Sequence, residues 1–186
     1  MILEEFDPYP QIVSERTPHP CAERFRASMR ATAASVSLLT SRGADGRFYG
    51  MAVTSWGSLS MEPPLMFVAV NRSASVHGII STRRHYCLNL MSEAHLAILE
   101  RFSRSDMRDE RFIADDWHAG PQGLPVLRDA LASQICTVQG TYDHGTHTIF
   151  VGRVEDVILL SGPTKNPAPL VWMNGARASL SAACHA

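Results

Sequence analysis

The sequence predicts a mainly β protein, an antiparallel β-barrel with a few covering α-helices. Apolar, β-branched segments outnumber the segments with helical spacing, and short turns join them as hairpins. They do not alternate regularly with helices, as the strands of a parallel sheet would. The chain has 186 residues, of which 45% are hydrophobic, which is enough for one core.

An arm followed by one domain is the expected organisation. Residues 1–20 contain Pro8, Pro10, Pro18 and Pro20 and predict an extended N-terminal arm, a candidate for contact with a partner subunit. The folded domain is then expected to span residues 21–186. It begins with a short amphipathic helix, because Phe25, Met29 and Ala33 recur at helical spacing.

Strands bounded by turn residues follow this helix. They are expected at residues 35–41, 47–56, 65–70 and 85–91. Two helices are expected among them, a short one at 75–80 and another at 92–102, where Ser92 provides an N-cap.

The second half of the chain predicts a long hairpin. Residues 132–142 and 147–160 are its two strands, and Asp143-His144-Gly145 is the turn between them. A polar stretch at 103–125 precedes the hairpin. A surface loop at 162–169 and one last short strand at 169–173 follow it.

The charge balance and the cysteines disfavour several classes of protein. Seventeen Lys and Arg against 18 Asp and Glu give a net charge of -1, too little to favour nucleic acid or a membrane surface as partner. The N-terminus lacks the pattern of a secretory signal, and no segment approaches the roughly 20 apolar residues of a spanning helix. The four cysteines have no CxxC spacing, which disfavours a zinc site or a disulfide framework. A reducing cytoplasm is the expected location.

The first candidate site is the polar segment Thr54-Ser55-Trp56-Gly57-Ser58 at a strand end. The sequence has neither GxGxxG nor a P-loop, so a nucleotide or flavin would need another seat. Hydroxyls and freed N–H groups at a strand end suit a ribityl chain or a phosphate, and Trp56 offers a flat apolar wall. Ordinary turn chemistry is the competing interpretation.

The second candidate site is Asn71-Arg72-Ser73-Ala74-Ser75, which leaves a strand and opens the expected short helix. A helix N-terminus presents unpaired N–H groups and a partial positive charge, and Arg72, Ser73 and Ser75 add donors there. These features predict a phosphate seat. A serine cap beside a solvated arginine is the alternative.

The third candidate is His147, at the mouth of the long hairpin. A side chain there can point over a barrel opening, although a capping histidine is the commoner outcome. A metal pair with His144 is disfavoured, because both would lie on a turn with no third ligand beyond Asp143, and no metal site is expected. A nucleophile pair of Cys136 with His147 stays open, without a local signature to support it.

Five segments in order resemble the short-chain flavin reductases of two-component flavin monooxygenases. They are GMAVTSWGSLSMEPPLMFVAVNRSAS, YCLNLMSEAHLAILERFS, ERFIADDW with GLPVLRDALAS, HGTHTIFVGRVEDVILL, and PLVWMNGAR. The resemblance covers roughly residues 22–180. Within the family the chain is most similar to the reductase components of 4-hydroxyphenylacetate 3-monooxygenases.

The resemblance implies an FMN-binding split β-barrel and an NAD(P)H-dependent reductase that supplies reduced FMN or FAD to a separate oxygenase. It also implies a homodimer with the flavin near the subunit interface. A catalytic role in placing the nicotinamide falls to His147, in a Gly-Thr-His variant of the family's Gly-Asp-His motif. The residues implied to bind flavin are Thr54, Ser55, Trp56, Ser58, Asn71, Arg72, Ser73, Ser75, Asn89 and Phe102, together with His147.

Two departures from the family pattern leave parts of this expectation open. Gly175-Ala176-Arg177 replaces a segment that usually carries a second aromatic and a basic residue, and Ala52 stands where a threonine is usual. The sequence does not distinguish FMN from FAD or NADH from NADPH, nor does it name the oxygenase or its substrate. A flavin-binding module without turnover, or a reductase of corrinoid or ferric acceptors on the same fold, are the alternatives.

Overall fold

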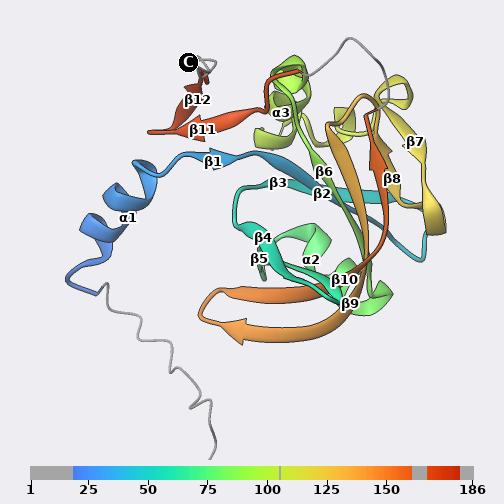
Figure 1. Ribbon diagram of the computed structural model, residues 1–186, viewed down its shortest axis with the longest axis horizontal. Helices are drawn as coiled ribbons and strands as arrows, with labels where there is room; N and C mark the ends of the chain where they lie inside the picture. The colour runs from blue at the N-terminus through green and yellow to red at the C-terminus, as the bar shows by residue number, and fades with distance from the viewer. Residues whose placement is uncertain (1–18, 105, 161–166, 181–186) are drawn as a thin grey trace, which may run out of the picture.

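The centre of the fold is a seven-stranded antiparallel sheet, seen in a computed structural model that describes residues 19–104, 106–160 and 167–180 (Figure 1). Across this sheet the strands are β3 (Phe48–Val53), β2 (Ser37–Arg42), β6 (His85–Leu90), β9 (Ala132–His144), β10 (His147–Leu159), β5 (Pro64–Asn71) and β4 (Trp56–Met61). The predicted antiparallel β class is confirmed. No helix among the described residues is long and apolar enough to cross a membrane.

The sheet curls until its two edges meet. Its edge strands β3 and β4 follow each other in the chain, with only Thr54 and Ser55 between them. The three residue steps from Val53 to Trp56 span at most about 11 Å even when extended, so the end of β3 and the start of β4 must be neighbours. The result is a split barrel with a corner at Thr54-Ser55.

Alternating side chains of the curled sheet fill its interior. In β5, Met66, Val68 and Val70 are buried and point inward, while the residues between them are half-buried. They pack against residues of β2, β6, β9 and β10, among which Leu39, Tyr86 and Phe150 have no exposed surface.

Two helices cover the sheet. Helix α2 (Ser75–Arg83) inserts Val76 and Ile80 into the interior cluster. Helix α3 (Leu96–Ser103) packs Ile98, Leu99 and Phe102 into a second core.

Short elements complete this second core. They are the strands β7 (Trp117–Ala119) and β8 (Pro125–Leu127) and the 3-10 turns η1 (Glu93–His95), η2 (Arg108–Glu110), η3 (Ala114–Asp116) and η4 (Pro121–Gly123). Trp117 and Leu127 are buried there beside Phe102, so the polar stretch 103–125 folds over the outer face of the sheet.

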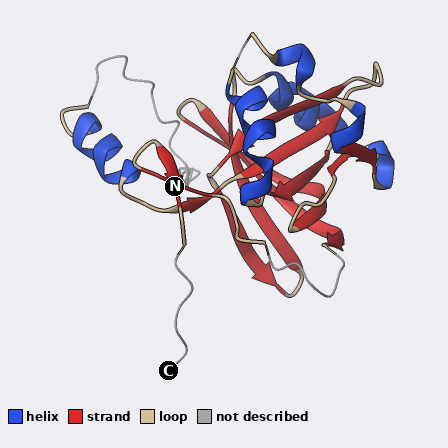
Figure 2. Cartoon of the chain, turned by 90° about the horizontal axis from the view of Figure 1, so that it is seen from above, coloured by secondary structure: helices blue, strands red, loops and turns tan. Residues whose placement is uncertain are grey.

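Helix α1 (Ala22–Arg30) lies apart from the barrel, in both views (Figures 1 and 2). A small sheet formed by β1 (Ala34–Ser35), β11 (Val171–Met173) and β12 (Ala176–Ala178) lies beside it. No residue of α1 is buried, and the side chains of Phe25 and Met29 are 63% and 52% exposed. The predicted amphipathic helix is therefore confirmed, but nothing in the described part of this chain covers its apolar face.

The structure corrects the predicted elements at three places, one of which is the hairpin of β7 and β8, formed where no strand was predicted. The strand predicted at 47–56 ends at Val53, and Trp56–Met61 form a separate edge strand, β4. A further strand, β12, follows the last predicted one across a turn at Asn174 and Gly175, both with positive φ. Most of the predicted arm at 1–20 and of the loop at 162–169 lies outside the described residues.

Candidate functional site

Three polar segments meet at one end of strands β4, β5 and β10. The N–H of Ala69 donates to the Ser55 carbonyl at 2.9 Å, which places the Thr54-Ser55 corner beside the end of β5. The last residue of β5, Asn71, pairs with His147 at the start of β10, and His147 pairs with His144 on β9. We call the segments 54–58, 71–75 and 144–147 the strand-end rim.

The 54–58 segment presents free hydroxyls and an indole. Thr54, Ser55 and Ser58 are exposed, and their hydroxyls have no partner in the described part of the chain. Trp56 is half-buried against the interior cluster, and its Nε1 is buried without a hydrogen-bond partner among the described residues. An orphaned buried donor is uncommon in a folded protein.

Thr54 also borders an apolar cavity of about 220 Å³ on the outer face of β3. Its remaining lining is mostly apolar and consists of Val36, Ala52, Val53, Leu99, Ser103 and Trp172. Ala52 is one of the two places where the chain departs from the family pattern, and Trp172 lies three residues before the other, Gly175-Ala176-Arg177. The small side chain of Ala52 leaves space in this cavity that a threonine would partly fill.

The 71–75 segment is a structured turn in which two of the predicted donors are already used. The Asn71 side-chain oxygen accepts hydrogen bonds from the N–H (2.9 Å) and hydroxyl (2.8 Å) of Ser73. Arg72 donates its N–H to the Thr146 carbonyl and its guanidinium to the Gly145 carbonyl, so it fastens the hairpin turn to β5. The hydroxyl of Ser75 has no partner within the described residues.

Helix α2 starts without a serine cap. Its N-cap residue is Ala74, which has no side chain able to accept a hydrogen bond, so the serine-cap alternative does not hold. The first N–H groups of a helix need acceptors, and a ligand anion beside Ser75 would supply them. Ser75 is therefore the most available donor of the predicted phosphate seat.

Ser75 lies at the edge of a second, larger cavity of about 460 Å³, which we call the arginine cavity. It lies between the first half of β3, the start of α2 and the segment after α3. Its other lining residues are Gly46, Arg47, Phe48, Tyr49, Gly50, Arg108, Asp109, Arg111 and Phe112. The sequence offered one signal for it, a pair of arginines three residues apart in a polar stretch with no assigned role.

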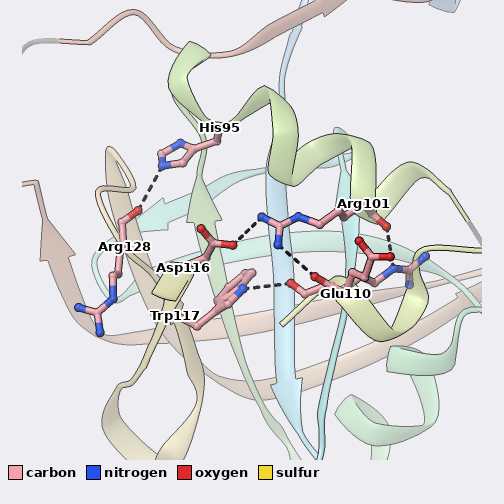
Figure 3. A network of polar contacts seen from close by, with 7 residues as sticks. His95, Arg101, Glu110, Asp116, Trp117 and Arg128 are labelled. Carbon is pink, nitrogen blue, oxygen red and sulfur yellow. Dashed lines mark hydrogen bonds and ion pairs between the residues drawn. The ribbon is translucent and has the colours of Figure 1, made fainter. Parts of the chain in front are cut away.

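A hydrogen-bonded network holds the wall of the arginine cavity against α3 (Figure 3). Arg101 forms an ion pair with Asp116 and donates to the Glu110 carbonyl at 3.1 Å. The Trp117 indole donates to the Arg111 carbonyl at 3.0 Å. These contacts fix both ends of the segment that carries Arg111 and Phe112.

His147 is exposed at the first position of β10. Its Nδ1 lies 2.9 Å from the Thr146 hydroxyl, and its Nε2 has no partner among the described residues. The next residue, Thr148, points inward and links the His77 ring to the Asp143 carboxylate. The hydrogen bonds of Thr148 thus hold the turn end of the β9–β10 hairpin in place, and the His147 ring is exposed beside it.

The structure places Asn89 away from the rim, fully buried under β8. Its side-chain nitrogen donates to the Leu38 carbonyl and the Thr40 hydroxyl, at 3.1 and 3.2 Å. Its oxygen accepts from the Leu127 N–H at 2.9 Å and the Ser133 hydroxyl at 2.8 Å. With no exposed surface and both amide groups engaged, Asn89 has no atom left for a flavin.

Phe102 is also buried, as a support for the arginine cavity. Its ring packs edge-on against Phe112 at 5.5 Å, and the Arg111 guanidinium lies 5.5 Å above it. We therefore treat Phe102 as a support for side chains that face a ligand.

The Cys136–His147 pair is not brought together. Cys136 lies in the barrel interior with its sulfur 3.4 Å from that of Met66, while His147 is exposed. Burial raises the pKa of the Cys136 thiol to about 12, so the sulfur stays protonated at neutral pH. The buried Cys87 has a raised pKa for the same reason.

The family model described as "Flavin reductase like domain" matches residues 29–181. Among characterised proteins, the FMN reductase (NADH) RutF of Agrobacterium fabrum is 34% identical over 138 residues, covering 74% of this chain and 79% of that protein. The reductase component of an FADH(2)-dependent resorcinol hydroxylase from Rhizobium sp. is 30% identical over 158 residues, covering 84% and 86%.

Solved structures agree with the fold. The flavin reductase PheA2 in its native state superposes with a TM-score of 0.74 at 26% identity, covering 86% of this chain and 98% of that one. A flavin reductase domain protein from Arthrobacter sp. FB24 gives a TM-score of 0.76 at 26% identity, covering 86% and 96%.

Proposed function

Because the chain belongs to the flavin reductase like domain family, we propose that it transfers hydride from NADH or NADPH to FMN or FAD and delivers reduced flavin to a separate oxygenase. One observation of the fold supports this most. The strand-end rim gathers three polar segments beside two cavities, at the corner where the barrel edges meet. NADH is the donor named for the Agrobacterium relative, and we take it as the preferred donor here.

The rim suits the polar middle of a flavin. The free hydroxyls of Thr54, Ser55 and Ser58 match a ribityl chain, which carries several hydroxyls of its own. The apolar cavity beside Thr54 gives the ring system a surface lined by Trp172. The residues present therefore fit the group in both shape and donor set.

The flavin phosphate is assigned to Ser75 and the start of α2. The free hydroxyl and the uncapped helix N-terminus both favour an anion there. The preceding residues of the turn, Asn71, Arg72 and Ser73, are proposed to position Ser75 and not to contact the phosphate. Asn71 and Ser73 are hydrogen-bonded to each other, and Arg72 is bound to the hairpin turn.

His147 is proposed to orient the nicotinamide. Its free Nε2 at the hairpin mouth can hydrogen-bond a carboxamide or ribose, and the Thr146 hydroxyl fixes the other ring nitrogen. Hydride passage from nicotinamide to flavin is the chemistry of the bound cofactors themselves. What the chain supplies is alignment of the two rings at contact distance, a large rate effect without a side-chain acid or base.

The test follows NADH oxidation by absorbance with excess FMN or FAD. The purified protein should accelerate oxidation above the flavin-only control, with saturation in both substrates. Replacing His147→Ala should lower the rate by about tenfold to a hundredfold while changing flavin affinity little, because alignment and not flavin binding is lost. His118→Ala, an exposed histidine on β7, is the matched control. Flavin binding without turnover would identify a binding module and overturn the proposal.

We also propose that the active form is a homodimer built around α1. The exposed Phe25 and Met29 form an apolar face on a helix that stands off its own barrel, which is costly in water unless a second subunit covers it. Sedimentation at micromolar concentration should give a dimer for the wild type and a monomer for Phe25→Glu. A monomeric wild type would refute this part.

A cytoplasmic location completes the proposal. Cys21, Cys87 and Cys136 are free thiols, and the exposed Cys21 in particular suits a reducing compartment. Cell fractionation with antibody detection should place the protein with cytoplasmic markers, and recovery in a periplasmic or secreted fraction would contradict this.

A further inference from the structure

The arginine cavity carries more positive charge than the single phosphate of FMN accounts for. Arg47, Arg108 and Arg111 line it, and Asp109 is the one carboxylate among its described lining residues. The guanidinium groups of Arg47 and Arg108 have no hydrogen-bond or ion-pair partner within residues 19–104, 106–160 and 167–180. Three arginines on one concave surface with a single carboxylate in its described lining repel one another, and a bound anion relieves that repulsion.

Arg111 adds a fixed charge at the back of this cavity. Its guanidinium donates to the carbonyl oxygens of Arg101, Phe102 and Arg104 at the end of α3, at 3.2 to 3.3 Å. None of these partners is a carboxylate, so the charge is held in place but not neutralised. Partial burial and the neighbouring charge of Arg108 both lower the pKa of Arg111, which agrees with an uncompensated pair.

Three aromatic residues also line the cavity. Phe48 and Phe112 meet edge-to-face at 5.6 Å and form one wall, and Tyr49, which also lines the cavity, packs against the interior cluster; all three are half-buried. Aromatic faces beside arginines are a combination that binds the base and the phosphates of a nucleotide. The volume of about 460 Å³ is also that of a small-molecule pocket and exceeds the need of one phosphate.

Gly50 keeps the floor of the cavity close to β2. A Cβ at this position would lie 2.8 Å from the Leu39 carbonyl oxygen and 3.2 Å from the Phe112 ring. Any side chain would push Phe112 outward and narrow the cavity. The open volume thus depends on the absence of a side chain at Gly50.

From these observations we propose that the arginine cavity binds the adenosine diphosphate half of a dinucleotide. This rests on the proposed function, since Ser75 joins the cavity to the assigned flavin phosphate seat. The adenine would lie on the Phe48–Phe112 wall, and the pyrophosphate would face Arg47 and Arg108. FAD and NADH both contain this chemical group, so the experiment distinguishes these two sources.

The test uses Arg47→Ala/Arg108→Ala, which leaves the structural contacts of Arg111 intact, and Arg83→Ala as an exposed-arginine control. Dissociation constants are measured by calorimetry for ADP, FMN and FAD, and KM for NADH with FMN as acceptor. ADP binding should weaken by about tenfold or more, as expected for lost charge-assisted hydrogen bonds, while FMN changes less than about twofold. Asp109→Asn should tighten ADP binding, which tests the charge argument without removing an arginine.

Each pattern of results decides the proposal. Weaker FAD with unchanged KM for NADH identifies the flavin as the source of the group, and a raised KM for NADH with equal FAD and FMN affinities identifies the nicotinamide dinucleotide. Equal losses for FMN and FAD, or no change in ADP, FAD and NADH, would overturn it. ADP titration needs no turnover, so ADP binding without NADH oxidation would refute the proposed function alone.

Discussion

Replacing Asn89→Ala should destabilise the protein strongly without weakening flavin binding. The variant leaves the Leu127 N–H and the Ser133 hydroxyl without their acceptor, and both residues are buried. A buried donor left unsatisfied costs about 1 to 3 kcal/mol, so two cost at least about 2 and centrally about 3 to 4 kcal/mol. For a chain of this length each kcal/mol lowers Tm by about 2 to 4 °C, which predicts a loss of roughly 6 to 16 °C.

The assay is thermal unfolding followed by circular dichroism, paired with FMN titration at a temperature where both proteins are folded. Ser133→Ala, which removes one of these hydrogen bonds, should cost only about 1 kcal/mol. An Asn89→Ala protein with unchanged Tm, or one whose main defect is a raised Kd for FMN, would refute the reasoning and return Asn89 to the flavin site.

The remaining predictions concern Ser75, Gly152 and His95. Ser75→Ala should raise the Kd for FMN about fivefold, because it loses about 1 kcal/mol of binding free energy, and should leave the Kd for riboflavin unchanged. Ser73→Ala should have a smaller direct effect, because the Ser73 hydroxyl already donates to Asn71. Equal losses of affinity for FMN and riboflavin would mean that the phosphate binds elsewhere. Gly152→Ala should lower the free energy of unfolding in urea by about 1 to 3 kcal/mol, since the added Cβ would meet the ring of the buried Tyr86. A variant with the same urea midpoint as the wild type would show that the Tyr86 ring moves aside without cost. Burial lowers the pKa of His95 below its ordinary 6.5, so below that pH the unfolded chain binds the extra proton and the free energy of unfolding falls. A His95→Asn variant should lose this part of the pH dependence. An identical slope of unfolding free energy against pH in both proteins would contradict this.

Much of the fold could be predicted from local patterns, and the misses have physical causes. Strand β5 carries a continuous apolar run and β6 is apolar apart from His85 and Asn89, and their short lengths between turn residues favour strands. Strand β4 was missed because it is an edge strand exposed on one side, and its glycine and serines have the composition of a turn. Strand β12 was missed although Asn174-Gly175 is a strong hairpin signal, because Ala-Arg-Ala alone has little β character.

The positions of the candidate site residues were predictable where those residues lie at the ends of strands or helices. Ser75 and His147 begin elements at the residues that the sequence predicts, whereas the strand before Thr54 ends three residues earlier than predicted; strand pairing brings all three to the same rim. The engagement of Arg72 with the hairpin turn and the burial of Asn89 depend on residues more than 35 positions away. The arginine cavity also required the tertiary structure, because Arg47 and Arg108 come together only when the segment after α3 folds back over β3.

The most direct test of flavin reduction is an anaerobic reaction of the protein with NADH and FMN, followed at the nicotinamide and oxidised-flavin absorbance bands together. Our account predicts that one oxidised FMN disappears for each NADH consumed, at a rate proportional to protein concentration, and that both bands stop changing when the limiting reactant is exhausted. NADH loss no faster than in the protein-free mixture, or NADH loss without an equal loss of oxidised flavin, would contradict it.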